Sequence, residues 1–176
     1  VNEEMQRLMQ LINDLLNFSR YQNGLQKLTL APCDTNDLLE HARARFAELA
    51  NAQNIDLVIE AQAQLPRLHA DRAQLERVLD NLLGNALRHT SEGGQIRLQA
   101  RRHGERLIIS VEDNGEGIAY GQQGRIFEPF VQVGRKKGGA GLGLALCKEI
   151  VQLHGGRMGV YSRPGQGTQF YMALPL

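Results

Sequence analysis

Helical and strand patterns alternate along this chain of 176 residues, but without the strand–helix–strand rhythm of a parallel sheet. Apolar residues recur at helical spacing at about residues 2–22, 34–53, 71–89 and 141–154. Alternating apolar and polar residues predict strands at about residues 25–31, 55–61, 95–101, 107–112, 157–162 and 168–174. This order predicts an α/β fold, a two-layer sandwich in which a mixed β-sheet packs on helices.

Acidic residues and a proline mark several of these boundaries. Pro32 is expected to close the strand at 25–31, and Asp34 can cap the helix that follows. Asp71 is expected to cap the next helix, with Gln74 at the capping-box position three residues later.

The helix at 2–22 carries a broad apolar stripe. Met5, Leu8, Ile12 and Leu15 are three or four residues apart, so they share one face. A face of this width favours a partner helix outside the domain. Packing of the helix on its own domain is the alternative.

Composition narrows the class of protein. Hydrophobic residues make up 42% of the chain and charged residues 22%, which is typical of a globular domain. A net charge of +1 argues against a nucleic-acid binder that works through overall charge. Cys33 and Cys147 form no metal or disulfide pattern and suit a reducing cytosol. No apolar run approaches the ~18 residues of a membrane span. A membrane anchor upstream of Val1 remains compatible with the sequence.

Two asparagines lie on one face of the helix at 71–89. Asn81 and Asn85 are four residues apart, and asparagine is a poor residue for a helix interior. They could hold Mg²⁺ and a nucleotide, or they could form hydrogen bonds between helices. Arg88, near the end of the same helix, could reach a phosphate or could be a solvated surface charge.

The sequence Asp113-Asn114-Gly115-Glu116-Gly117 follows the strand at 107–112. Asn-Gly at this point is also a hairpin signal, but no alternating strand follows it. A carboxylate at a buried strand end can accept a hydrogen bond from the exocyclic amine of adenine. The two glycines can let the backbone approach a flat ligand.

Glycines are also dense where the last helix begins, at residues 138–143. A glycine-rich backbone at a helix N-terminus presents free N–H groups to a phosphate. Gly143 is followed by Leu144 and Ala145, so neither the Walker loop nor the Rossmann fingerprint is present. The whole stretch 113–140 lacks periodicity and is expected to be a binding loop or lid.

Taken in order, these motifs resemble the ATP-binding domain shared by histidine kinases, DNA gyrase, Hsp90 and MutL. The resemblance covers about residues 28–175. Histidine kinases are the most similar, because Phe127-Glu128-Pro129-Phe130 resembles their phenylalanine box. Leu-Leu-Asn-Phe-Ser-Arg at 15–20 resembles the second helix of their dimerisation hairpin.

The resemblance implies a role for each motif. Asn85 would bind Mg²⁺, Asn81 would support the phosphates, and Asp113 would bind adenine N6. The remaining residues implied in ATP binding are Arg88, His89, Gly115, Gly117, Ile118, Phe127, Arg135, Lys136, Lys137, Gly139, Gly141, Leu142, Gly143, Leu144 and Thr168. Residues 131–140 would form a mobile lid.

It also implies an organisation and partners. Residues 1–24 would be the second helix of the dimerisation hairpin, and residues 25–176 the ATP-binding catalytic domain. The parent would be a homodimer, cytoplasmic in this part and anchored in the inner membrane. It would transfer the γ-phosphate of ATP to a histidine and then to the receiver domain of a response regulator. A gyrase- or chaperone-like ATPase and a nucleotide-free interaction module are the alternatives.

Two departures from related families matter. Gyrase-like ATPases carry a glutamate where this chain has Asn81, and a carboxamide cannot act as a general base. This favours phosphoryl transfer to a protein over hydrolysis. The phosphoacceptor box of histidine kinases surrounds none of the histidines, which are His41, His69, His89, His103 and His154.

Overall fold

The computed structural model describes residues 2–132 and 141–176, and it confirms the predicted two-layer α/β sandwich. The helices are α1 (Asn2–Gln22), α2 (Thr35–Ala52), α3 (Arg72–His89), α4 (Tyr120–Gln123) and α5 (Gly143–Leu153). The strands are β1 (Ala31–Cys33), β2 (Asp56–Ala61), β3 (Leu68–Ala70), β4 (Gln95–His103), β5 (Arg106–Asp113), β6 (Arg157–Arg163) and β7 (Gly167–Pro175).

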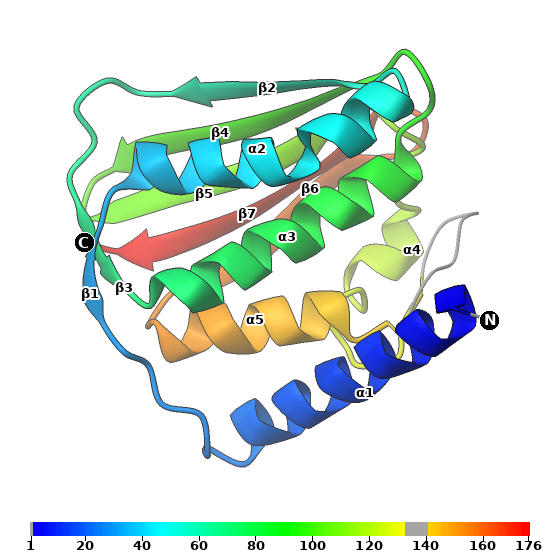
Figure 1. Ribbon diagram of the computed structural model, residues 1–176. Helices are drawn as coiled ribbons and strands as arrows, with labels where there is room; N and C mark the ends of the chain where they lie inside the picture. The colour runs from blue at the N-terminus through cyan, green and yellow to red at the C-terminus, as the bar shows by residue number, and fades with distance from the viewer. Residues whose placement is uncertain (1, 133–140) are drawn as a thin grey trace.

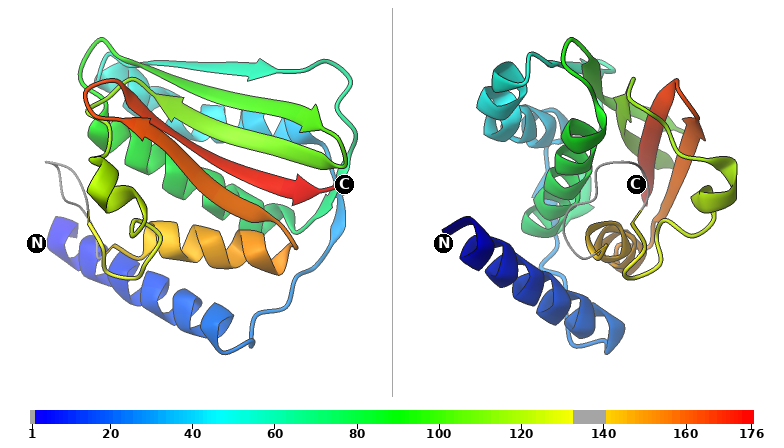
Figure 2. Two further views of the ribbon diagram at one scale, coloured as in Figure 1. Left: turned by 180° about the vertical axis from the view of Figure 1, so that it is seen from behind. Right: turned by 90° about the vertical axis from the view of Figure 1, so that its right-hand side faces the viewer.

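The larger sheet is mixed, as expected. Its strand order is β2-β4-β5-β7-β6, in which β2 and β4 run parallel and the other neighbours are antiparallel. Helices α2, α3 and α5 lie side by side on one face of this sheet, and none of the three covers the other face (Figures 1 and 2). The described residues therefore form a hydrophobic core between these helices and the inner face of the sheet.

Alternation along the central strands decides which side chains enter the core. Leu107, Ile109 and Val111 of β5 are almost fully buried and share one face of the strand. Phe170 and Met172 of β7 are buried on the same side. The odd-numbered residues of β5 therefore face the helices up to the end of the strand, where Asp113 stands.

Helix α1 packs on α5, outside the two layers (Figures 1 and 2). Its predicted apolar stripe is exposed, and Tyr21 is the residue of α1 that is buried. No helix among the described residues is long and apolar enough to cross a membrane. Helix α1 thus packs on its own domain, which was the alternative that we gave, while Met5, Leu8, Ile12 and Leu15 of its stripe stay exposed.

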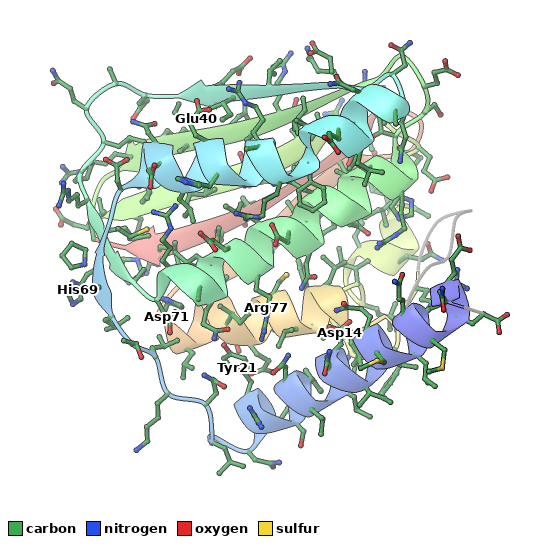
Figure 3. All side chains as sticks on the ribbon, in the orientation of Figure 1. Asp14, Tyr21, Glu40, His69, Asp71 and Arg77 are labelled. Atoms are coloured by element: carbon green, nitrogen blue, oxygen red, sulfur yellow. The ribbon has the colours of Figure 1, made fainter. Side chains whose placement is uncertain are left out.

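A hydrogen-bonded group ties the end of α1 and the segment after it to the start of α3. The Tyr21 hydroxyl donates to Gln74 Oε1 at 2.5 Å, and Thr29 N–H donates to Asp71 Oδ2 at 3.0 Å. Asp71 caps α3 through Gln74 N–H at 3.3 Å, as predicted. In a full capping box the Gln74 side chain would in turn accept a hydrogen bond from the Asp71 N–H. In this part of the structure the Asp71 N–H donates to His154 Nε2 instead, at 3.1 Å. Figure 3 labels Tyr21 and Asp71 at this end of the molecule.

The predicted strand at 25–31 is wrong. The backbone there is irregular up to β1, which begins at Ala31 and includes Pro32 rather than ending before it. Leu25 and Leu30 are exposed, so their alternation reflects no buried face. Because β1 pairs with β3 alone, in a two-stranded sheet of its own, a proline costs few ladder hydrogen bonds.

Candidate nucleotide site

Asp113 is a buried carboxylate at the end of a central strand. It lies on the inner face of β5 and is only 5% exposed. Burial raises the pKa of its carboxyl, while the N–H of Gly115, the nearby His89 and the N–H of Thr168 act in the opposite direction. The Gly115 N–H donates to Asp113 Oδ1 at 2.9 Å. A carboxylate held here can accept a hydrogen bond from a ligand that shields it from water.

The predicted glycine loop passes close to the protein's own backbone. A Cβ on Gly115 would lie 2.0 Å from the carbonyl oxygen of His89. Gly117 has a φ of +74°, and a Cβ there would lie 2.2 Å from the carbonyl oxygen of Arg163. We expected these glycines to admit a flat ligand. The structure shows that they let the loop fit between the end of α3 and the β6–β7 turn, and their contact with a flat ligand stays a prediction.

Ser162 is a site residue that sequence reasoning missed. Its hydroxyl accepts from Ile118 N–H at 2.8 Å, donates to the Gly167 carbonyl at 2.8 Å and contacts Thr168 Oγ1 at 2.9 Å. It thereby joins the end of the glycine loop to Thr168, which is paired with Asp113 across the sheet. Nothing in the local sequence marks this serine, because the residues it joins are distant along the chain.

Helix α3 presents a polar ridge to the site. Asn81, Asn85 and His89 are spaced by four residues, so they stand one above another on one face. Asn81 Nδ2 donates to the carbonyl oxygen of Gly143, the first residue of α5, at 3.3 Å. His89 Nδ1 lies 2.7 Å from Glu116 Oε1 in the glycine loop. The ridge therefore links the start of α5 to the loop after β5.

The contacts of Asn81, Asn85 and Arg88 can be compared with the interpretations that the sequence left open. Asn81 does make the hydrogen bond between helices that we gave as an alternative. Asn85 Oδ1 accepts a long 3.4 Å hydrogen bond from Arg88 Nη2. Arg88 is exposed, and partial desolvation lowers the pKa of its guanidinium, which stays charged. The Arg88 guanidinium and the Asn85 amide oxygen are thus adjacent near the C-terminal end of α3.

The segments around α5 complete the site. Gly141 has a φ of +75°, and its carbonyl oxygen accepts from Phe130 N–H at 3.0 Å. Leu142 is buried at the start of α5, which begins two residues later than we expected. Ile118 is also buried, and Leu144 packs against the core. Arg135, Lys136, Lys137 and Gly139 lie outside the described residues.

The two phenylalanines of the Phe-Glu-Pro-Phe motif differ in their surroundings. Phe127 meets Phe170 of β7 edge to face, with ring centroids 6.0 Å apart. Phe130 is 63% exposed and has a φ of +67°. Phe127 therefore anchors this loop on the core, whereas Phe130 stands outside it.

Comparisons with known proteins agree with this arrangement. The family model described as histidine kinase-, DNA gyrase B- and HSP90-like ATPase matches residues 70–176. The alginate biosynthesis sensor protein KinB of Pseudomonas aeruginosa is 69% identical over 176 residues, which are 100% of this chain and 30% of that protein. The chain thus spans less than a third of the length of this relative.

Two solved structures are similar over nearly the whole chain. Full-length ShkA in complex with AMPPNP has a TM-score of 0.90 at 36% identity, over 98% of this chain and 36% of that one. The histidine kinase ThkA in complex with the response regulator TrrA has a TM-score of 0.82 at 27% identity. That match covers 99% of this chain and 48% of ThkA.

The close backbone approach at Gly115 generates a prediction about stability. Gly115→Ala should lower the free energy of unfolding by about 2 kcal/mol or more, because its methyl group would overlap the His89 carbonyl. Gly84→Ala is the matched control. That glycine lies inside α3 with nothing within 4 Å of an added Cβ, and the change should stabilise the chain by about 0.5–1 kcal/mol. Urea unfolding measures both, and a Gly115→Ala chain as stable as the parent would contradict the packing described for this loop.

Proposed function

The chain belongs to the family of histidine kinase-, DNA gyrase B- and HSP90-like ATPases, and from that premise we propose that it is the ATP-binding catalytic domain of a sensor histidine kinase. The single observation that carries the proposal is Asp113, a buried carboxylate at a strand end, beside a loop whose glycines are fixed by packing. Its ligand would be the N6 amine of adenine, because an ionised carboxylate only accepts hydrogen bonds. Gly115, Gly117, Ile118 and Thr168 would line the adenine pocket.

The phosphates would lie between the α3 ridge and the start of α5. Among the described residues, no side chain caps the N-terminus of α5, so its first N–H groups suit phosphate oxygens. Asn81 is held against Gly143 at this point. Arg88, Gly139, Gly141, Leu142, Gly143 and Leu144 would surround the phosphates, with Arg135, Lys136 or Lys137 as further contacts. Residues 131–140 would be the lid.

Asn85 fits the role of a Mg²⁺ ligand by its donor chemistry. Mg²⁺ prefers oxygen ligands, and at nucleotide sites it takes one or two from the protein and the rest from phosphates and water. Asn85 Oδ1 is only weakly engaged by Arg88 and can be released to a metal ion. When bound, Mg²⁺ would neutralise the charge of the triphosphate.

Asn81 favours kinase over ATPase activity. An ATPase needs a base to activate water, and a carboxamide cannot accept that proton. The side-chain amide of Asn81 moreover already donates a hydrogen bond to the Gly143 carbonyl oxygen. The domain would therefore act by positioning ATP for transfer to a protein acceptor, with charge neutralisation rather than acid–base chemistry.

The exposed stripe of α1 supports the proposed domain organisation. Residues 1–24 would be the second helix of a dimerisation hairpin, since Met5, Leu8 and Leu16 are about half exposed on a helix that packs on α5. Residues 25–176 would be the catalytic domain. The parent would be a homodimer anchored in the inner membrane, and a response-regulator receiver domain would be its partner, as TrrA is for ThkA.

The role of Asp113 can be tested by calorimetry. Asp113→Asn should weaken ATP binding by at least about 1–3 kcal/mol, because a charge-assisted hydrogen bond to the adenine amine is lost. Unchanged affinity would remove Asp113 from the adenine site.

The free energy of unfolding of Asp113→Asn serves as the control. The direction in which the substitution changes this free energy follows from the pKa of Asp113. Burial raises this pKa above 3.8, so the stability that the protonated carboxyl contributes is present at low pH and is lost as pH rises through the folded-state pKa. Asn is neutral throughout. Asp113→Asn should therefore be at least as stable as the parent at neutral pH, which separates lost affinity from unfolding.

The Mg²⁺ role of Asn85 has its own test. In the parent chain, Mg²⁺ should tighten ATP binding, and Asn85→Ala should abolish this tightening because the amide oxygen is gone. Titrations with ATP in the presence of Mg²⁺ or of a chelator measure the effect. The same Mg²⁺ dependence in both chains would show that the ligand lies elsewhere.

The chain should bind ATP without labelling itself. His41 and His89 do lie beside carboxylates, but neither has the phosphoacceptor sequence, and His89 stands at the proposed adenine end. Incubation with γ-labelled ATP should give no acid-labile phosphate. Adding a partner helix that carries a phosphoacceptor histidine should give labelling. Stoichiometric acid-labile label on the chain alone would contradict this account, and His89→Asn would show whether His89 carries it.

A further inference from the structure

The face of the large sheet that is turned away from α2, α3 and α5 carries a hollow of about 620 Å³ (Figure 2). This volume lies within the range of sites for small molecules. The lining includes Gln99 of β4, Ser110 of β5 and Gln169 of β7. Asp113 lies on the inner face of β5, so the hollow is separate from the proposed nucleotide site.

The three polar side chains form a hydrogen-bonded ladder whose direction is set by Glu60. A carboxylate only accepts hydrogen bonds, so Gln99 Nε2 donates to Glu60 Oε2, at 3.2 Å. Gln99 Oε1 then accepts from Ser110 Oγ and from Gln169 Nε2, both at 3.2 Å. The same Gln169 nitrogen also donates to Ser110 Oγ at 3.4 Å. Gln169 Oε1 is therefore left as an acceptor, and it has no partner among the described residues.

A second acceptor without a partner stands beside the first. Glu112 is opposite Gln169 in the register of β5 and β7, and both line the hollow. Arg97 is opposite Glu112 on β4, but its Nε donates to Gln95 Oε1 at 3.1 Å and lies 3.8 Å from Glu60 Oε1. Within residues 2–132 and 141–176, the Glu112 side chain has neither an ion pair nor a hydrogen bond. A carboxylate next to an amide oxygen calls for a cation with several N–H donors.

An aromatic face adjoins these two acceptors. Tyr161 is opposite Gln169 on β6, stacks on Tyr171 with ring centroids 5.5 Å apart, and stays 67% exposed. Tyr171 lies over Gly159, where an added Cβ would be only 2.3 Å from the tyrosine hydroxyl oxygen. A planar cation can stack on a tyrosine ring and still donate hydrogen bonds in its own plane.

The other end of the hollow carries a positive charge. Arg101 belongs to the lining and has no ion pair or hydrogen bond in the part of the chain that the structure describes. On β4 it lies four residues beyond Arg97, the residue opposite Glu112, so about 13 Å of strand separates the two ends. The side chains of Arg101 and Glu112 shorten this span. The hollow therefore suits a ligand with a cation at one end and a carboxylate at the other.

We propose that this hollow binds a free guanidino acid, a small molecule with the chemistry of arginine. Its guanidinium would donate to Glu112 and to Gln169 Oε1 while it stacks on Tyr161, and its carboxylate would pair with Arg101. A guanidinium holds five N–H donors in one plane, which suits two adjacent acceptors beside a ring better than an ammonium does. The inference goes beyond the proposed function and does not depend on nucleotide binding.

The test is a titration of the isotope-labelled chain with L-arginine, followed by NMR. Saturable shifts should include the side-chain amides of Gln99 and Gln169. L-citrulline has an uncharged urea in place of the guanidinium and should bind about fivefold or more weakly. N-acetyl-arginine-N-methylamide represents an arginine inside a protein. It lacks the free carboxylate and should bind about 2- to 5-fold more weakly than L-arginine.

Variants of the lining test where the ligand binds. Glu112→Gln should weaken L-arginine binding about fivefold or more, because the acceptor loses its charge. Tyr161→Ala should weaken it about 2- to 5-fold through the lost stacking. Two matched controls should keep the parent's affinity. They are Glu105→Gln, an exposed carboxylate between β4 and β5, and Tyr120→Ala, a ring that is 68% exposed at the start of α4.

The outcomes distinguish the parts of the proposal. The absence of saturable shifts with L-arginine would overturn it, and so would equal affinity for L-citrulline. Equal or tighter binding of the capped compound would overturn the assignment to a free small molecule in favour of an arginine side chain of a partner protein. Unchanged affinity in Glu112→Gln and Tyr161→Ala would overturn the location. The three ligands are compared on the parent chain, so that comparison holds even where a variant does not fold.

Discussion

The site depends on the antiparallel register that sets Asp113 of β5 opposite Thr168 of β7. This pairing extends the inner face of the sheet by one residue beyond the apolar core and puts a carboxylate there. Burial opposes ionisation of that carboxyl, and the Gly115 N–H is one of the few groups that favour it. A side chain in such a position is unfavourable for stability alone, which is typical of residues kept for binding.

Three segments meet around Asp113, and each is held by contacts with the others. The glycine loop fits against the end of α3 at Gly115 and against the β6–β7 turn at Gly117. Ser162 closes the arrangement by bonding to Ile118 and Thr168. At the other end of the ridge, the amide of Asn81 fixes the start of α5. The part of the site that would meet the base is thus held in place by contacts within the protein itself, which reduces the ordering cost of binding.

Sequence reasoning found the residues whose position follows from local periodicity. The alternation of Leu107, Ile109 and Val111 places Asp113 on the inner face, and four-residue spacing aligns Asn81 with Asn85. It failed at residues 25–31, where alternation occurs without a sheet to bury one face. It also missed Ser162 and the His89–Glu116 pair. Ser162 is 44 residues from Ile118, and His89 is 27 residues from Glu116, so only the tertiary fold brings these groups together.

The central claim is that a buried carboxylate selects adenine, and the direct test is to compare Mg-ATP with Mg-GTP on the unmodified chain by calorimetry. Guanine presents a carbonyl oxygen where adenine presents its amine, so Asp113 would face another acceptor and lose its hydrogen bond. The account predicts that ATP binds at least about tenfold more tightly than GTP. Equal binding of the two nucleotides, or binding of neither, would contradict it.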